Sequence, residues 1–473
     1  MPNKVAAFST QKGGSAKYNY AEETYTIRLN DPDEGTLIPT DIITTLTINE
    51  DLFSLLPTFS LQICDKGAFF SGFNVKNGDI LYIKITPNID SKDEPLPYID
   101  SAFCIQSITC VPDLSTNTYN YNIVGIYNAQ NYLNQVTTYP KTSDLSYIER
   151  DEKTSSEAIH EVLDDTTLSF NNQCTPQDNS LWINCNDTRS QFIEKIVKHA
   201  WVGEDDAPLI YTDRNGQTYY TSIKYLAEKK KLCKFENIKY YYEKIKPDGP
   251  EELTMLFGDS SFLHAAGPIL NQGGYKIREA YYSPYNFTKL FDDDITYSDF
   301  NFNDFITELL LASGDIDIVD TLIGQIMENI TLGKYRMVEY TQNTPYLASI
   351  SNKAASQIDN VSKYIDCGMY FQDYHSHYDL APSHNEMIRR SFFQNFINMT
   401  VDVHRLPIEF KNNKCRPVLS DKVYIDFSTM ASIDKIHSGN YIVCGIKHNF
   451  RANQAYTMEM KCVTDGTFGL GAV

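Results

Sequence analysis

The chain has 473 residues, of which 42% are hydrophobic and 22% are charged, and this balance excludes wholesale disorder. The formal net charge of −20 argues against a protein that grips nucleic acid, because an acidic surface repels phosphate backbones. No stretch of 18 apolar residues occurs, so we expect no transmembrane helix.

The first 135 residues have the pattern of β-strands throughout. Residues 18–29 alternate polar and apolar side chains and end at the turn-forming segment 30–35. The other strands expected in this region are residues 42–48, 58–63, 81–85, 102–111 and 119–127. Short strands separated by loops predict an antiparallel barrel or sandwich. The aromatic content of 13% also favours strands.

A small α+β domain is expected next. Thr154 and Glu157 have the spacing of a capping box and predict the start of a helix. Residues 186–189 have the composition of a second helix cap. Segments 208–211 and 218–222 then predict a hairpin, because an Asn-Gly pair lies between them and is a strong hairpin signal.

The last half of the chain mixes strands with a helical section. Apolar residues with a helical period predict that residues 304–399 are mainly helical. The strands expected around this section are residues 238–245, 252–257, 274–282, 400–404, 422–427, 440–449 and 454–463. Strands on both sides of a helical block predict a second barrel whose chain is interrupted by an insertion.

One segment resembles a phosphate-binding loop. Residues 4–17 contain paired glycines and a lysine, but Ala16 stands where a glycine should precede that lysine, and Tyr18 follows it. The next residues alternate as a strand does, so no helix N-terminus would face a phosphate. We therefore expect a flexible N-terminal arm.

Two segments contain residue types that metal sites and acid–base catalysis use. His375, His377, His384 and Asp373 could hold a metal ion, but their segment has the composition of an exposed loop. The acidic run at residues 292–294 has no partner motif around it and predicts a solvated loop. We therefore expect no metal site and no cofactor.

Nucleophilic catalysis finds no support either, and no Gly-x-Ser-x-Gly motif is present. His448 alternates with apolar residues, which predicts a structural role in a strand. The basic run Lys229–Lys231 is short and predicts a solvated surface instead of a DNA contact. The ten cysteines include no Cys-x-x-Cys pair, so we expect mostly reduced core residues. Nothing in the sequence predicts an enzyme.

Two regions carry a resemblance to a known family. Residues 57–65 and 75–83 are similar to a pattern "Phe-x-Leu-x-Ile-x-Asp … Gly-Asp-x-Val-x-Ile", and residues 438–450 are similar to "Ser-Gly-x-Tyr-x-Val-x-x-Val-x-His-x-Phe". A returning strand with Tyr456 and Thr457 follows. The matching residues are Phe59, Leu61, Asp65, Gly78, Asp79, Ser438, Gly439, Tyr441, Val443, His448, Phe450, Tyr456 and Thr457. The departures are Ile446 for valine, and Met458 and Met460 for leucine.

These patterns resemble the central baseplate hub proteins of contractile-tailed bacteriophages, whose fold is shared with the N-terminal part of type VI secretion spike proteins. The resemblance implies a β-rich α+β fold with two similar antiparallel β-barrels of the tail-tube type. The expected parts are a first barrel with a flexible arm at 1–138, a small α+β domain at 139–235, a second, discontinuous barrel at 236–303 and 400–473, and a mainly helical insertion at 304–399.

The resemblance further implies a homotrimer in the tail baseplate of a virion, made in the host cytoplasm. Three chains would place six barrels in a ring that adapts the sixfold tail tube to the threefold central spike. The implied partners are the tail tube protein, the central spike protein, baseplate wedge proteins and the tape measure protein, while DNA passes through the lumen without specific binding.

Two alternatives stay open. A tail-associated glycan or peptidoglycan hydrolase would need a carboxylate pair in a cleft, and no convincing pair is present in the sequence. The same fold could also serve as the hub of a non-contractile tail tip or a secretion spike. A secretion spike should continue into a needle domain, and the residues before Val473 contain no needle repeat.

Overall fold

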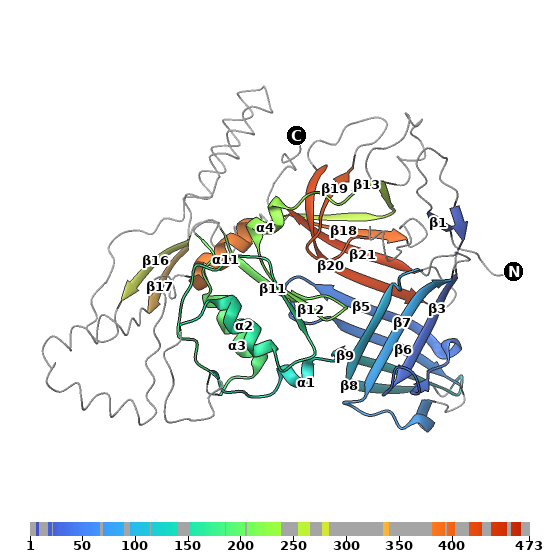
Figure 1. The fold of residues 1–473 in the computed structure, drawn as a ribbon. Coiled ribbons are helices and arrows are strands. Elements are labelled where there is room, and N and C mark those ends of the chain that lie inside the picture. The colour runs from blue at the N-terminus through green and yellow to red at the C-terminus, as the bar shows by residue number, and fades with distance from the viewer. Residues whose placement is uncertain are drawn as a thin grey trace, which may run out of the picture.

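Most of the described strands belong to two groups that pair with each other, and a smaller part with helices and strands lies beside them (Figure 1). The computed structural model describes residues 6–8, 18–20, 22–66, 70–88, 95–113, 115–140, 152–184, 186–203, 206–237, 254–264, 277–282, 334–339, 381–392, 395–402, 416–427, 437–451 and 456–464. Within these residues, none of the helices has the length and apolar character needed to span a membrane.

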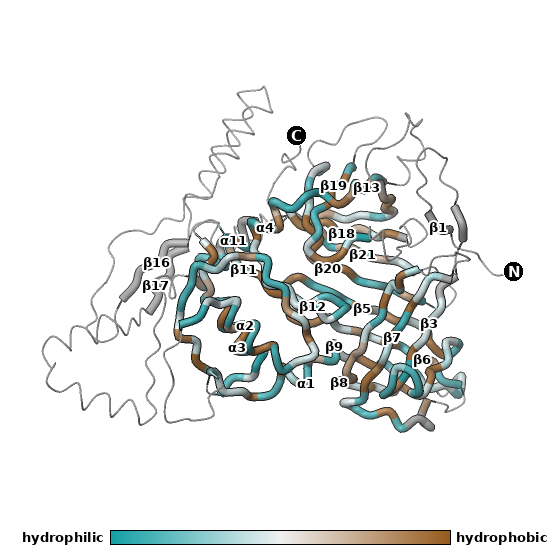
Figure 2. Tube along the Cα trace, in the orientation of Figure 1, coloured by the Kyte–Doolittle hydropathy of each residue, from teal (hydrophilic) through white to brown (hydrophobic). Residues whose placement is uncertain are grey.

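The N-terminal group, here termed the first β unit, is antiparallel throughout and has the order β5-β6-β9-β8-β7-β3-β4. Its strands are β3 (Glu22–Leu29), β4 (Thr36–Leu37), β5 (Ile43–Asp51), β6 (Thr58–Asp65), β7 (Ile80–Asn88), β8 (Ile99–Asp113) and β9 (Thr118–Tyr127). Short 3-10 helices, η1 (Thr40–Ile42) and η2 (Phe70–Phe73), precede β5 and β7. Hydrophobic and hydrophilic residues alternate along these strands, as Figure 2 shows. The expected strands and their antiparallel pairing are confirmed, but a barrel is not.

The C-terminal group is termed the second β unit. Its strands are β13 (Lys234–Asn237), β14 (Thr254–Phe257), β15 (Ser260–His264), β18 (Asn395–Asp402), β19 (Lys422–Asp426), β20 (Gly439–Arg451) and β21 (Thr457–Thr464). β13 runs parallel to both β14 and β19, whereas β15, β18, β20 and β21 pair in an antiparallel manner. The unit is therefore a mixed sheet.

One long strand joins the two units. The first part of β20 pairs with β19, and its second part, Gly445–Arg451, pairs antiparallel with residues 45–51 of β5. The opposite edge of β20 pairs with β21. All strands of both units thereby form one 14-stranded sheet. Among the described strands, no ladder closes either unit into a barrel. The β-rich α+β fold is therefore confirmed, whereas the two closed barrels are not.

The small α+β domain has the expected helices and hairpin. Its elements are α1 (Gln130–Leu133), α2 (Ser155–Leu163), β10 (Ser169–Asn172), α3 (Arg189–His199), β11 (Pro208–Thr212), β12 (Gln217–Ser222) and α4 (Ile223–Glu228). Thr154 with Glu157, and Thr188 with Gln191, form the capping boxes that begin α2 and α3. The helices α1, α2 and α3 share a core of their own. By contrast, Leu209 and Tyr211 of β11 and the buried residues of α4 belong to the core of the two β units.

Only parts of the predicted helical insertion fall within the described residues. They are the strand β17 (Lys334–Glu339), which pairs parallel with β16 (Ile277–Tyr282), the helix α11 (Ala381–Phe392), and the beginning of β18. A second separate pair, β1 (Ala6–Phe8) and β2 (Tyr18–Tyr20), lies near the N-terminus. The expected strand at 238–245 lies outside the described residues, and the predicted domain boundaries stay predictions.

Tight packing inside the first β unit gives a test of this fold. A Cβ added at Gly125 on β9 would lie 2.2 Å from the carbonyl oxygen of Cys104 and 2.3 Å from a ring carbon of Phe59. We expect Gly125→Ala to lower the free energy of unfolding by about 1 to 3 kcal/mol, because the strands must move apart. Calorimetry measures the shift, and Gly72→Ala is the control, since no atom lies within 4 Å of its added Cβ. Equal unfolding temperatures in the two variants would contradict this packing.

Candidate functional site: a buried junction of three parts

The N-terminal motif residues form part of the first β unit and its turns. Phe59 and Leu61 of β6 are buried in the core, and the Phe59 ring centroid lies 5.1 Å from that of Phe103. Asp65 is also buried, and its Oδ2 accepts the Phe70 backbone N–H at 2.8 Å. These three residues hold strand positions in the core, without an arrangement that suggests chemistry.

Gly78 and Asp79 form the turn that leads into β7. Gly78 has a φ of +92°, a conformation that favours glycine, and its N–H donates to the Ile105 carbonyl oxygen at 2.7 Å. Asp79 Oδ2 accepts the Lys76 N–H at 2.8 Å. The turn is therefore held by a backbone hydrogen bond at Gly78 and by the Asp79 side chain, which accepts from the Lys76 backbone.

Four C-terminal motif residues hold the start of β20. Ser438 Oγ accepts the Phe427 N–H at 2.9 Å, and Gly439 pairs with Ile425 of β19. The Tyr441 hydroxyl donates to the His437 carbonyl oxygen at 2.6 Å. In the same region the Val443 N–H donates to the Asp421 carbonyl oxygen at 2.9 Å.

The remaining motif residues meet the first β unit. The rings of Phe450 and Tyr456 stack with centroids 4.5 Å apart, and Thr457 pairs with Asn449 at the beginning of β21. Tyr98 of the first β unit lies 5.0 Å from Tyr456, measured between ring centroids. This part of the motif therefore lies where the two units join.

Glu50 is the charged centre of this junction. On β5 it occupies the same buried face as Leu46 and Ile48, and it pairs with Ile446 of β20. Its carboxylate is almost completely buried, and its Oε2 lies 3.0 Å from Nε2 of His448. We term Glu50, Arg214, His448 and Tyr456 the buried junction.

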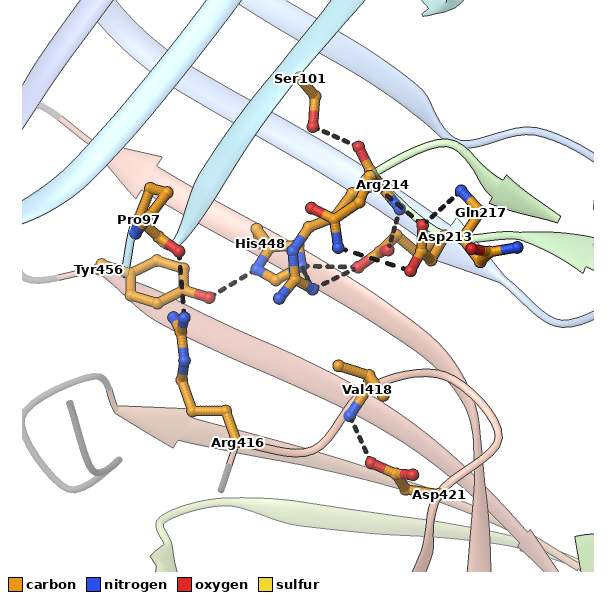
Figure 3. Close-up of polar contacts among 12 residues, drawn as sticks. Pro97, Ser101, Asp213, Arg214, Gln217, Arg416, Val418, Asp421, His448 and Tyr456 are labelled. Atoms are coloured by element: carbon orange, nitrogen blue, oxygen red, sulfur yellow. Dashed lines mark hydrogen bonds and ion pairs between the residues drawn. The ribbon is translucent and has the colours of Figure 1, made fainter. Parts of the chain in front are cut away.

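Arg214 enters this junction from the small domain. It lies in the turn between β11 and β12, where Asp213 Oδ1 accepts the N–H groups of Asn215 and Gln217. The Arg214 backbone N–H donates to Glu50 Oε1 at 2.8 Å, and its Nη1 donates to Glu50 Oε2 at 3.0 Å. Figure 3 shows the Arg214 side chain pointing toward His448, while the Arg214 carbonyl oxygen accepts from the Ser101 hydroxyl. The junction thus joins three parts of the chain.

The electrostatics favour a charged pair beside a neutral histidine. Burial alone would raise the pKa of Glu50, but the Arg214 charge and the His448 hydrogen bond outweigh it and lower that pKa to about 2. Burial lowers the pKa of His448 below its ordinary value. Neutral His448 then donates a hydrogen bond from Nε2 to Glu50 and accepts one from the Tyr456 hydroxyl at Nδ1. This network requires the tautomer with its proton on Nε2.

This arrangement has no open position for a substrate. Both Glu50 oxygens accept hydrogen bonds from within the chain, and both nitrogens of the His448 ring have partners. A buried, fully paired network of this kind specifies which segments meet and in which register. The junction is therefore a structural site that fixes the relation of three parts.

The other candidate residues do not assemble into a site. Among the described residues, no group of three or more His, Cys, Asp or Glu side chains could hold a metal ion. His384 contacts Trp201, with the two ring planes tilted by 39°, and its Nε2 lies 3.1 Å from the Gly203 carbonyl oxygen. His375, His377, Asp373 and residues 292–294 lie outside the described residues. Cys104, Cys233, Cys444 and Cys462 are buried free thiols, as expected, whereas Cys110 is exposed.

Sequence reasoning missed Glu50 and Arg214. A signal for Glu50 was present, because it continues the alternation of Leu46, Ile48 and Leu52 and so places a carboxylate on a core-facing position. A buried carboxylate needs a charged or hydrogen-bonding partner. No local pattern identifies Arg214 as that partner, since 164 positions separate the two residues.

Removing the carboxylate should cost far more here than at the surface. Glu50→Gln leaves the Arg214 guanidinium buried without its counter-charge, so we expect a loss of about 3 to 5 kcal/mol in stability. Glu459→Gln is the control, because Glu459 pairs with Lys447 on the same sheet while partly exposed, and its loss should cost about 1 kcal/mol or less. Calorimetry of both variants measures the difference. Equal losses would show that the junction is not a buried ion pair.

The pH dependence of stability provides a second test. The pKa of His448 is lower in the folded than in the unfolded chain, so His448 makes the folded state less stable as pH falls below its ordinary pKa of 6.5. The contribution of Glu50 is lost only between its ordinary pKa of 4.5 and about 2. We expect His448→Gln to flatten the decline in unfolding temperature between about pH 7 and pH 5.

His160→Gln, which removes an exposed histidine of α2, is the control for that measurement. The pKa of buried Asp178 is raised to about 6 by burial and contributes in the opposite direction, but this group is common to all the proteins compared. If the unfolding temperature of His448→Gln declined with falling pH as steeply as that of the unsubstituted chain, His448 would not be neutral and buried.

No protein-family profile matches the chain, and no curated protein matches it. Among solved structures, the chain is similar to the 43 kDa tail protein of prophage MuSo2 from Shewanella oneidensis, with 11% identity and a TM-score of 0.49 over 95% of this chain and 100% of that chain. It is also similar to the tail protein from Neisseria meningitidis MC58, with 10% identity and a TM-score of 0.46 over 95% and 99% of the two chains.

A third similarity is to the E. coli c3393 protein, with 6% identity and a TM-score of 0.37 over 91% of this chain and 76% of that chain. That protein is described as a component of the type VI secretion system with structural similarity to T4 bacteriophage tail proteins.

Proposed function

We propose that this chain is a structural hub of a phage tail baseplate and acts without catalysis. In this proposal three copies form a ring that adapts a sixfold tail tube to a threefold central spike. The observation that supports it most is the position of His448, Phe450 and Tyr456. These residues of the hub-like motif lie where the two β units join and where the small domain contributes Arg214.

A hub of this kind needs two β units in a fixed relation, because each chain would provide two of the six positions under the tube. The ladder between β5 and β20 has seven register pairs, from Gly445–Asp51 to Arg451–Thr45. Backbone hydrogen bonds along that ladder resist sliding of one unit over the other. The buried junction adds a contact that holds in one register only.

The negative charge supports a passage for DNA. A chain with a formal charge of −20 offers phosphates little attraction, so DNA would slide past without condensing on basic side chains. The proposed partners are the tail tube protein, the central spike protein and wedge proteins, with the tape measure protein in the lumen before ejection. Contractile tails, non-contractile tail tips and secretion spikes could all use such an adaptor.

The ring predicts a distinct image and mass for the purified protein. We expect negative-stain electron microscopy to show rings with an open centre, and sedimentation velocity to show a species of three chains. The hydrolase alternative predicts release of cell-wall fragments by the purified chain, which we expect to be absent. Monomers at every concentration, both alone and with the spike protein, would contradict the adaptor, and release of cell-wall fragments would favour the hydrolase.

A further inference from the structure

A basic surface interrupts this acidic chain beside α4. Between residues 224 and 234 the sequence has five lysines and a single acid, Glu228. The fold brings Lys422 from β19 to the same place, because its Nζ donates to the Ala227 carbonyl oxygen at 2.7 Å. We term the set Lys224, Lys229, Lys230, Lys231 and Lys422 the lysine surface.

The fold holds several of these lysines in place. Lys229 Nζ donates to Ser420 Oγ at 2.8 Å, and Lys231 Nζ lies 5.2 Å above the Tyr424 ring centroid. Segments about 190 positions apart in sequence therefore meet at one surface. This surface also contains Glu228 and Asp421, which lies near Lys229, but its lysines are in excess. A short lysine run in the sequence would otherwise be a solvated surface, so this convergence is what the structure adds.

Apolar side chains lie among these charges. Tyr225, Leu232 and Val418 are 40%, 37% and 39% exposed. Leu232 is joined to the lysine surface by its N–H, which donates to the Lys422 carbonyl oxygen at 2.9 Å. Exposed apolar groups surrounded by charge are typical of a surface that binds another protein, whereas a phosphate-binding surface needs no such groups.

The first β unit has a surface of opposite charge. The turn after β3 exposes Asp31, Asp33 and Glu34, and Asp31 Oδ1 accepts the N–H groups of the other two residues at 2.8 and 2.7 Å. Leu37 of β4 follows and is 50% exposed. We term Asp31, Asp33, Glu34 and Leu37 the acidic turn. It combines carboxylates, of which that of Asp31 holds the turn, with one exposed apolar group. The lysine surface likewise combines ammonium groups with apolar groups.

We propose that the lysine surface of one copy of this chain binds the acidic turn of the next copy. This inference rests on the proposed ring and names the contact that closes it. A closed ring of identical chains needs two different surfaces that fit each other head to tail. Figure 1 shows α4 and β3 in different parts of the molecule, as such a contact requires. A second copy is favoured over nucleic acid because exposed apolar side chains lie among the lysines, and a phosphate backbone has no use for them.

Charge reversal on either side tests this contact. Lys224→Glu with Lys230→Glu, or Asp33→Lys with Glu34→Lys, should each raise the dissociation constant for self-association by about 10-fold or more. Asp31 is left unchanged because it holds the turn. The control is Lys66→Glu with Lys76→Glu, an equal change of charge at two exposed lysines outside the lysine surface. Sedimentation velocity at low and high ionic strength measures the constants.

The chain with all four substitutions is the decisive variant. The two altered positions on each surface then carry opposite charges again, so we expect the two losses of association to cancel in part instead of adding. The contact would be overturned if the two losses of association added instead of cancelling. It would also be overturned if neither double variant weakened the trimer. In either case the proposed ring would stand without this contact.

Other outcomes separate the contact from the ring. A chain that is monomeric under all conditions would overturn both. Binding of a short DNA duplex that Lys224→Glu with Lys230→Glu abolishes, with self-association unchanged, would assign the lysine surface to nucleic acid and overturn the contact. Circular dichroism of each variant confirms that a loss of association does not reflect unfolding.

Discussion

The pairing of β5 with β20 is the constraint on which the rest of the structure depends. β5 belongs to a sheet built from the first 127 residues, and β20 lies near the other end of the chain. Each strand has its own neighbour on the opposite edge, β6 for β5 and β21 for β20. The contact therefore gives hydrogen-bond partners to the backbone groups at one edge of each unit. It also removes two exposed strand edges that would otherwise pair with other chains.

The buried junction specifies this pairing more than it stabilises it. Transferring a carboxylate and a guanidinium out of water is costly, and well-packed apolar residues of similar size are often as stable. A charged pair, however, tolerates only one register. A shift of one residue would turn Glu50 to the opposite face of the sheet, away from Arg214 and His448. The hairpin turn of the small domain must then sit over β5 as well, so one carboxylate fixes the relation of three parts.

Local features were predictable from the sequence, whereas distant contacts were not. The capping box at Thr154 and the Asn-Gly hairpin depend on residues that are near neighbours, and both are present as expected. The strands of the first β unit follow from alternation. The alternation of β5 cannot reveal that β20 is its partner, because any strand with a buried face would fit the same pattern. Barrels were expected from the strand pattern and from the resemblance, whereas the described strands of the two β units form one continuous sheet.

Charge distribution matters more than net charge when an acidic chain assembles with its own copies. Each added copy brings the same negative charge, and charges separated by more than about 8 Å are largely screened at physiological ionic strength. Association is therefore decided by the residues that touch, and a favourable contact requires a local change of sign. The lysine run appeared isolated in the sequence because Lys422 lies almost 200 positions away. Folding joins β19 to the segment after α4, and this creates a basic surface on a chain whose composition is acidic.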